Sequence, residues 1–533
     1  MKADKTLICV LLFGFTLNTL AIDWGIPNSH SWNPDDIAPG KPLRVRETYI
    51  HGWDKYPYLQ SWIDFAIFSS FLFYWTTRKT YVSASNLAIE TRFNDPYRQL
   101  SVLIILSRIL TAIMALGVVY WTYQISLLVF RDPLAAVLGA LILTCSNVFV
   151  FHAQLGNVDV PCLFWFAWSL YYYARILQTN ELKNYLAFGF LSACALATKE
   201  SIVGAYVLVG MTLYAVHVKR ALSDLKTPGF RRLWNIHSDP RLLGLLAVLL
   251  LTYALVNNVF FNWQGFTRHF THWVGSDAPG IAPYSRVQLG VRWLLRTFVL
   301  QLREGMGGAF LLLCTGGLVY GLKRNFRGSL LLILPLVSYY LFTIQMVHFT
   351  YTRFGLPVIV LLSIFGGLFA ACLSRSKWAP LSILIVVLAF AHGILMSANT
   401  IVTMRNDSRY ATEQWLIENI PKTERIGVFG LRTYFPRFGL LGYETERLAD
   451  DLIRVDYLTA DGPRYLVLTS TYYVPSEAPQ KKVVDALFSH KLNYRIIWNF
   501  RYESPLEPLL GYHYMSGFIN PRITVFRRED NSL

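Results

Sequence analysis

Long apolar runs recur between residues 6 and 397 of this chain, and they constrain its fold more than any other feature. A membrane-spanning helix needs about 20 mostly apolar residues. Only 15% of the 533 residues are charged, against about 25% in an average soluble protein. We therefore expect an α-helical polytopic membrane protein with about 11 spans: 6–22, 101–123, 133–151, 160–177, 184–200, 201–217, 242–261, 306–322, 328–346, 354–373 and 378–397.

The first run follows Lys2 and Lys5 and has the pattern of a signal peptide. We expect an uncleaved first span instead, because the rest of the chain is itself embedded in the membrane. Basic residues gather in alternate loops, as near Arg131 and Lys323-Arg324. The positive-inside rule makes that side cytoplasmic. The run 61–77 contains Asp64, and counting it as a span would place all later basic loops on the outer side. We therefore expect an interfacial or re-entrant helix there.

Three regions then face away from the cytoplasm: residues 23–100, residues 262–305 and the tail 398–533. The tail alternates a helical pattern with short strand-like runs, which is typical of a small α/β domain. We expect a helix at 407–421 and strands at 425–430, 464–470, 493–500 and 522–528. The sequence thus predicts a transmembrane module, 1–397, and an extracytoplasmic α/β domain, 398–533.

Acidic and basic residues are concentrated on the predicted outer side. Asp35-Asp36 follow Pro34, where a carboxylate could act as general base, although Asn-Pro-Asp-Asp also suits a plain turn. Asp54 and Lys55 could hold a cation and a phosphate, or form an ordinary surface ion pair. Asp159 lies between Gly-Asn and Pro161, where a helix N-cap is the simpler alternative.

Two further motifs complete the set. His269 and His272 share one helix face and could help hold a divalent metal, or belong to an interfacial helix. Arg353 lies at the outer end of a span and could bind a lipid phosphate, or extend to the interface without a ligand. Ionisable residues gathered on one face indicate a site open to lipid and to the outer compartment.

The order of these motifs resembles the integral-membrane glycosyltransferases of the C-type fold (GT-C), in the branch of the protein O-mannosyltransferases and lipid A aminoarabinose transferases. The resemblance covers roughly the first 400 residues and rests on "NPDD", "WDKYPYL", "GNVDVP", "LSACALATKES", "TRHFTHW" and "YTRFGLP". This sequence has Asp-Asp where Asp-Glu is commoner, and Tyr-Pro-Tyr where Pro-Pro is commoner.

The resemblance implies an inverting transferase that uses a polyprenyl-phosphate-linked sugar. It implies Asp35 as catalytic base beside Asp36, Asp159 as second functional carboxylate, and Lys55 and Arg353 as phosphate ligands. Asp54 with His269 or His272 would hold the one cofactor expected, a divalent metal cation.

The expected partners are a glycan, lipid or protein acceptor and membrane lipids, in a bacterial inner (plasma) membrane. No motif indicates nucleic-acid binding. The net charge of +16 is explained by the basic residues that gather in the loops on the predicted cytoplasmic side. A transporter or flippase of lipid-linked sugars is the alternative function. It would usually bind substrate near the membrane midplane, between internal repeats, and no repeat is evident in this chain.

Overall fold

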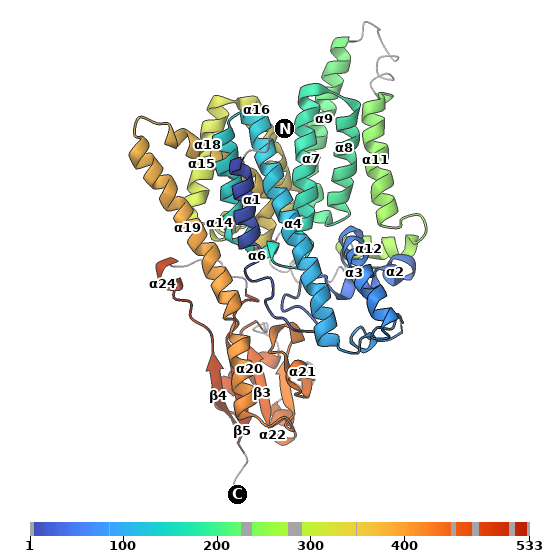
Figure 1. The fold of residues 1–533 in the computed structure, drawn as a ribbon, viewed down its shortest axis with the longest axis vertical. Helices are drawn as coiled ribbons and strands as arrows, with labels where there is room; N and C mark the ends of the chain where they lie inside the picture. The colour runs from blue at the N-terminus through green and yellow to red at the C-terminus, as the bar shows by residue number, and fades with distance from the viewer. Residues whose placement is uncertain are drawn as a thin grey trace. The chain divides into compact units, whose positions relative to one another are not determined.

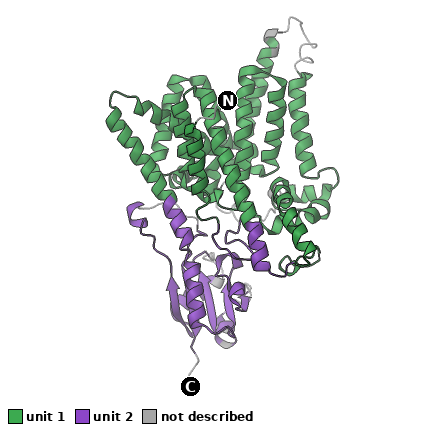
Figure 2. Cartoon of the chain, in the orientation of Figure 1, with its two compact units in different colours: residues 1–22, 37–92, 105–397 green, residues 23–36, 93–104, 398–533 purple. Residues whose placement is uncertain are grey.

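The computed structural model describes residues 5–84, 86–224, 237–274, 290–347, 349–448, 455–471, 479–510 and 517–529. The chain forms two compact units (Figure 2). Unit 1 comprises residues 1–22, 37–92 and 105–397, and unit 2 comprises residues 23–36, 93–104 and 398–533. Segments 275–289 of the second predicted outer loop and 225–236 of a predicted basic loop lie outside the described residues.

Unit 1 is helical (Figure 1). Its first half contains α1 (Lys5–Leu17), α2 (Gly40–His51), α3 (Leu59–Thr77), η1 (Glu90–Arg92), α4 (Pro96–Phe130), α5 (Pro133–Thr144), α6 (Asn147–Ala153), α7 (Asp159–Thr179), α8 (Leu182–Leu196) and η2 (Glu200–Ile202). Its second half contains α9 (Val203–Asp224), α11 (Pro240–Val256), α12 (Trp263–Val274), α14 (Val291–Met306), α15 (Gly308–Arg324), α16 (Phe326–Tyr339), η3 (Tyr340–Ile344), α17 (Gln345–Val347), η4 (Thr352–Gly355), α18 (Leu356–Ser374) and α19 (Ala379–Arg405). The first turns of α4 and the end of α19 belong to unit 2.

A helix occupies each of the eleven predicted runs, but the count of eleven spans is not confirmed. Within the described residues, five helical segments are long and apolar enough to cross a membrane, or up to seven if two bent pairs each count once. The run 133–151 breaks into α5 and α6, which are bent by 66°. Others are short: the 17 residues of α11 extend about 26 Å, less than the hydrocarbon thickness of about 30 Å. The helices indicate a membrane protein.

The segment predicted to be interfacial or re-entrant is helix α3, which is not among those candidate spans. It lies with α2 and α12 at one end of the helices of unit 1 (Figure 1). Asp64, the charge that made this run ambiguous, is fully buried and accepts hydrogen bonds from Ser107 Oγ at 3.1 Å and Gln60 Nε2 at 3.3 Å. The acid therefore joins α3 to α4.

Glycines let the central helices of unit 1 approach closely. A Cβ atom on Gly367 of α18 would lie 2.2 Å from the Gly139 nitrogen of α5, and one on Gly317 of α15 would lie 1.8 Å from the Phe365 carbonyl of α18. Small residues permit backbone contact between membrane helices, where packing rather than water exclusion drives association. These contacts form the core of unit 1.

We expect Gly367→Ala to destabilise the protein by about 1–3 kcal/mol, because the added methyl group has no space and the helices must separate. Gly210→Ala in α9 is the matched control, since a Cβ there meets nothing within 4 Å. Thermal unfolding in detergent would measure both variants. An equal effect of the two would contradict this account of the α5–α18 contact.

Unit 2 is an α/β domain. Its strands are β1 (Ile426–Phe429), β2 (Thr445–Leu448), β3 (Tyr465–Thr469), β4 (Tyr494–Phe500) and β5 (Ile523–Arg528), and its helical segments are α20 (Ser408–Asn419), η5 (Arg432–Tyr434), α21 (Phe438–Leu441), α22 (Val455–Ala460), α23 (Pro479–Phe488) and α24 (Glu507–Leu510). The sheet order is β2-β1-β3-β5-β4. The β1–β2 and β1–β3 pairs are parallel, whereas β5 pairs antiparallel with β3 and β4. The predicted helix and all four predicted strands are present.

Alternate residues along the strands pack on opposite faces of the sheet. Val428 and Val467 pack with Leu416 of α20, whereas Phe429 and Leu466 pack in a second cluster with residues of α22 and α23. Two apolar faces explain why the strands read as short continuous apolar runs rather than as alternating ones.

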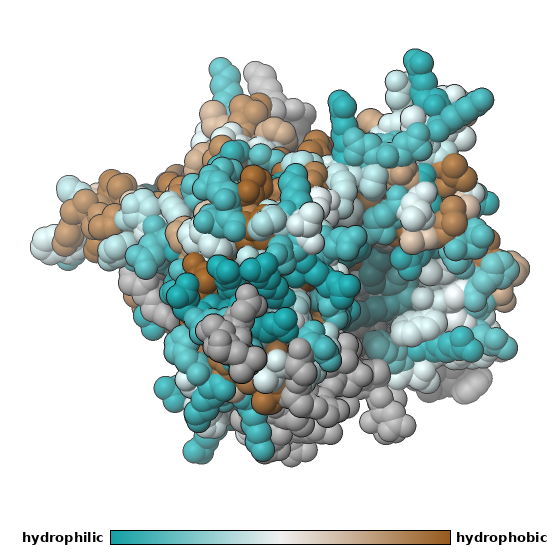
Figure 3. Space-filling view, turned by 90° about the horizontal axis from the view of Figure 1, so that it is seen from below, coloured by the Kyte–Doolittle hydropathy of each residue, from teal (hydrophilic) through white to brown (hydrophobic). Residues whose placement is uncertain are grey.

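Exposed apolar side chains are common along the helices of unit 1, such as Leu250 of α11 and Leu388 of α19. The face drawn in Figure 3 is instead mostly hydrophilic. Apolar side chains on helices and hydrophilic ones elsewhere are the distribution that a lipid-embedded chain requires.

Candidate active site

A pocket at the beginning of α7 gathers three of the charged residues of unit 1. Its empty volume is about 260 Å³, and Asp159, Lys199 and Arg353 line it together with apolar side chains. Asp159 is the first residue of α7, Lys199 precedes η2, and Arg353 lies in η4 just before α18. Three separate stretches of the chain, each at a break between apolar helices, therefore place these charges together.

The Asp159 carboxylate is buried, with 6% of the side chain exposed, and forms an ion pair through Oδ1 with Lys199 Nζ. The helix N-cap is Val158, which makes no side-chain cap bond, and the Asp159 nitrogen donates to Asn157 Oδ1 at 3.1 Å. The Asp159 carboxylate thus holds a lysine and does not occupy the N-cap position.

Both cations of the pocket share an aromatic neighbour. The Phe354 ring centre lies 5.5 Å from Lys199 Nζ and 6.0 Å from Arg353 Cζ. Arg353 also lies over the Tyr351 ring at 5.6 Å. Aromatic rings attract cations more strongly where water is excluded. Two cations and one carboxylate in an apolar pocket give a net positive site that suits a phosphate group.

The residue after Lys199 belongs to a second cluster, which consists of Glu200, His269, Asp54 and Lys41. Glu200 pairs with His269 Nε2 of α12, and His269 Nδ1 lies 2.7 Å from the Asp54 carbonyl oxygen. The Asp54 carboxylate pairs with Lys41 of α2 and also accepts from the Tyr56 nitrogen at 3.2 Å. Neighbouring residues in the α8–η2 turn thus connect the Asp159 pocket with the predicted outer loops.

Sequence reasoning missed Lys199 and Glu200 as site residues. A signal exists in the sequence, because they are the one charged pair between the apolar runs 184–200 and 201–217. Taken alone, however, such a pair indicates only a turn between two helices.

Two other predicted site residues, Lys55 and His272, occupy less enclosed positions. Lys55 is exposed, and its Nζ lies 5.5 Å from the centre of the Tyr56 ring. The His272 ring lies 5.2 Å from that of Trp53. Burial lowers the pKa of His272, with the positive charges of Lys55 and His269 adding to the effect.

Two of the three predicted metal ligands, Asp54 and His269, have protein partners in the structure. In the part of the chain that the structure describes, no group of three or more His, Cys, Asp or Glu side chains could hold a metal ion. Both ring nitrogens of His269 have protein partners, and the Asp54 carboxylate is paired with Lys41. A divalent metal at Asp54, His269 and His272 remains an untested prediction.

His269 should make the stability of this region depend on pH. Burial alone would lower its pKa, but the hydrogen bond and charge of Glu200 prevail, so the pKa of His269 is raised above its ordinary value of 6.5. The charged His269–Glu200 pair therefore stabilises the folded state fully below pH 6.5. This stabilisation is lost as the pH rises through the pKa that His269 has in the folded state. Melting temperatures across this range should show a gap between wild type and His269→Gln that narrows as pH increases. A gap independent of pH would contradict the charged pair.

The acidic pair Asp35-Asp36 belongs to unit 2. Asp36 closes a turn: its carboxylate accepts from Ser31 Oγ at 2.5 Å and from Asn33 Nδ2 at 2.8 Å. Asp35 is half-buried, and its backbone nitrogen lies 3.3 Å from Asn33 Oδ1. The turn interpretation therefore describes Asp36.

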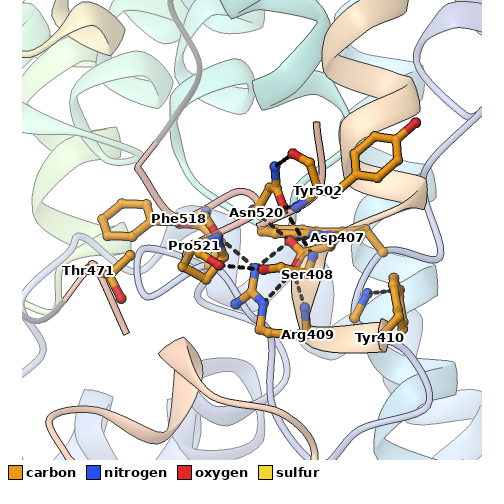
Figure 4. Close-up of polar contacts among 12 residues, drawn as sticks. Asp407, Ser408, Arg409, Tyr410, Thr471, Tyr502, Phe518, Asn520 and Pro521 are labelled. Atoms are coloured by element: carbon orange, nitrogen blue, oxygen red, sulfur yellow. Dashed lines mark hydrogen bonds and ion pairs between the residues drawn. The ribbon is translucent and has the colours of Figure 1, made fainter. Parts of the chain in front are cut away.

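Aromatic and charged residues fix the segment that carries this turn. Trp24 Nε1 donates to Asp407 Oδ2 at 3.0 Å, and the Trp32 ring centre lies 4.0 Å from Arg409 Cζ. Asp407 also pairs with Arg409 and accepts from the Asn520 nitrogen at 2.8 Å (Figure 4). All of these residues belong to unit 2.

Ile37 follows the acidic pair and lies in unit 1. Its nitrogen donates to the Gly156 carbonyl at 2.9 Å, three residues before Asp159. The chain that leaves the acidic turn is thereby hydrogen-bonded to the segment that leads into α7.

Known proteins provide an independent comparison for the stretch from α4 to α9. A family model described as dolichyl-phosphate-mannose-protein mannosyltransferase matches residues 99–231. This stretch is similar to membrane mannosyltransferases. It contains both Asp159 and Lys199, and the match confirms the resemblance to GT-C glycosyltransferases. A comparison with curated protein sequences finds no match.

Several solved structures are similar to this chain at low identity. They include the archaeal oligosaccharyltransferase AglB from Archaeoglobus fulgidus, in complex with an inhibitory peptide and a dolichol-phosphate (12% identity, TM-score 0.47, covering 98% of this chain and 88% of that one). ArnT from Cupriavidus metallidurans, bound to undecaprenyl phosphate, has 10% identity and a TM-score of 0.46, covering 98% of both chains. The S. cerevisiae Pmt1–Pmt2 complex, bound to the sugar donor, has 16% identity and a TM-score of 0.35, covering 49% of this chain and 34% of that one.

Proposed function

We propose that this protein is an inverting glycosyltransferase that moves a sugar from a polyprenyl-phosphate donor to an acceptor on the extracytoplasmic face of a bacterial inner membrane. One observation carries the proposal: Asp159, Lys199 and Arg353 converge in a pocket at the ends of apolar helices. The family that matches residues 99–231 is named for mannosyl transfer from a dolichyl phosphate to protein, which supports the donor class.

Lys199 and Arg353 bind the donor phosphate in this proposal. A guanidinium and an ammonium stabilise the charge that grows on phosphate as the sugar leaves. The apolar side chains of Leu163, Ile202 and Leu356, which line the same pocket, exclude water and strengthen these interactions. Lys55, which is exposed near Tyr56, is a further proposed phosphate ligand.

Asp35 is the proposed general base. It accepts the proton of an acceptor hydroxyl, whose oxygen forms a bond to the anomeric carbon as the bond to the phosphate oxygen breaks. Polyprenyl phosphate leaves, and attack from the opposite side inverts the anomeric centre. Asp159 positions Lys199 through their ion pair and so acts on the donor indirectly.

No observation on the described residues favours the transporter alternative. The charges of the described pocket lie at the beginning of α7 and in loops, whereas transporters usually bind substrate near the midplane between repeats.

Turnover by the purified full-length protein in detergent tests the proposal. A panel of polyprenyl-phosphate sugars is offered with glycan, lipid and peptide acceptors, and release of polyprenyl phosphate is followed. Release from one donor, with a new glycosidic bond of inverted configuration, is expected. Movement of the same lipids across liposomes without hydrolysis or transfer would replace the enzyme with a transporter.

A further inference from the structure

A second, larger pocket lies at the opposite end of α7 from Asp159. The helix has 21 residues, so its ends are about 30 Å apart. The empty volume of this pocket is about 1820 Å³, and its walls come from the ends of α4, α7 and α9 and from the α15–α16 turn. Apolar residues including Val129, Leu177 and Val216 line it, and so do five cations: Arg131, Lys219, Arg220, Arg324 and Arg327.

Two side chains build this pocket by binding the free carbonyls of helix ends. Arg220 of α9 donates to the Ile176 carbonyl at 3.0 Å and to the Leu177 carbonyl at 2.6 Å, at the end of α7. Asn325 donates to the Val129 carbonyl of α4 at 3.0 Å and accepts from the Gly328 nitrogen at 3.0 Å, capping α16. The pocket is therefore a defined part of the fold.

The charge of the pocket is one-sided. No carboxylate is among its described lining residues. The acid nearest in sequence, Asp132, caps α5 and is held by Arg375 Nη1 at 2.5 Å and Nη2 at 2.9 Å. Its distance to Arg324 Nη1 is longer, 3.6 Å. Among the described lining residues, five cations therefore face no carboxylate.

We infer that this pocket binds the headgroup of an anionic glycerophospholipid, in the leaflet opposite to the Asp159 pocket. A phosphate diester supplies the negative charge that the cations match, and its acyl chains suit the apolar lining. Basic pockets between membrane helices are typical sites for such headgroups. The site is independent of the proposed sugar transfer.

The backbone at Arg131 gives the test a clean variant. Arg131 has a φ of +53°, directly after the end of α4. Asparagine adopts this left-handed conformation more readily than arginine, and the same position after α7 is Asn180, with a φ of +53°. Arg131→Asn should therefore remove a cation without disturbing the fold.

Native mass spectrometry and thermal shift of the full-length protein test the inference, with phosphatidylglycerol, phosphatidylcholine of the same acyl chains, and inorganic phosphate as probes. Phosphatidylglycerol should bind and raise the melting temperature more than the other two. Each cation removed should weaken its binding roughly fivefold, and Arg131→Asn/Arg327→Gln roughly thirtyfold.

Lys323→Gln is the matched control, because Lys323 lies in α15 next to Arg324 but is not a lining residue. It should keep the preference for phosphatidylglycerol. Equal binding of the two lipids, or an unchanged preference in Arg131→Asn, would overturn the inference. Stabilisation by inorganic phosphate as strong as that by the lipid would instead assign the pocket to a soluble phosphate compound.

Discussion

Lys199→Met is expected to lower the rate of polyprenyl phosphate release by about 10²- to 10³-fold. In the proposed reaction Lys199 stabilises charge that develops on the leaving phosphate, and removal of one such group costs about that factor. The variant also leaves Asp159 buried without its ion-pair partner. Breaking a buried pair from one side destabilises a protein by about 3–5 kcal/mol.

A double variant separates the two effects. Asp159→Leu/Lys199→Met removes both charges of the buried pair, and apolar replacement of such a pair is often neutral for stability. We expect melting temperature to recover while transfer stays lost. Lys183→Gln is the control, since Lys183 is largely exposed and pairs with Glu181. Recovery of turnover together with stability in the double variant would show that the pair is purely structural.

The second large effect is expected at the acidic turn, where neighbouring residues should behave differently. Asp35→Asn should reduce turnover by about 10²- to 10⁴-fold, the usual contribution of a general base. Asp36→Asn should instead destabilise by about 1–3 kcal/mol, because the Asp36 carboxylate accepts from Ser31 and Asn33.

Turnover at saturating donor and acceptor, with thermal unfolding of the same preparations, measures both variants. Asp35→Glu is a useful companion, because it keeps a carboxylate while moving it. Full turnover in Asp35→Asn would exclude this residue as the base, whatever the result for Asp36.

Regular patterns made most of the helices and the tail sheet predictable. The runs at 425–430 and 522–528 are short, apolar and bounded by turn residues, and they are β1 and β5. Strand β2 was not predicted, because "TERL" is charged and largely exposed at the sheet edge. Its strand conformation depends on parallel pairing with β1, which no local pattern encodes.

Long-range contacts explain what remained hidden at the candidate site. Asp159 could be selected as an acid between apolar runs, but its partner Lys199 lies 40 positions further along the chain. The same holds for Glu200 and His269, which are 69 positions apart. Spacing within a helix or strand gives no information on such pairs, because helix packing brings them together.

Hydropathy also missed a helix break. The run 133–151 is apolar except for Thr144, Ser146 and Asn147, and the helix breaks at these polar residues: α5 ends at Thr144 and α6 begins at Asn147, with a 66° bend. Hydropathy counts apolar residues without regard to direction, so a bent pair and a straight span give the same signal.

The contacts of Trp24 and Trp32 with Asp407 and Arg409 make unit 2 discontinuous along the chain. A truncation or chimera divided at residue 397 would separate the acidic turn from the residues that hold its segment in place. Any exchange of C-terminal domains between related proteins must therefore transfer residues 23–36 and 93–104 as well. In evolution, substitutions in residues 23–36, 93–104 and 398–533 should therefore be inherited together.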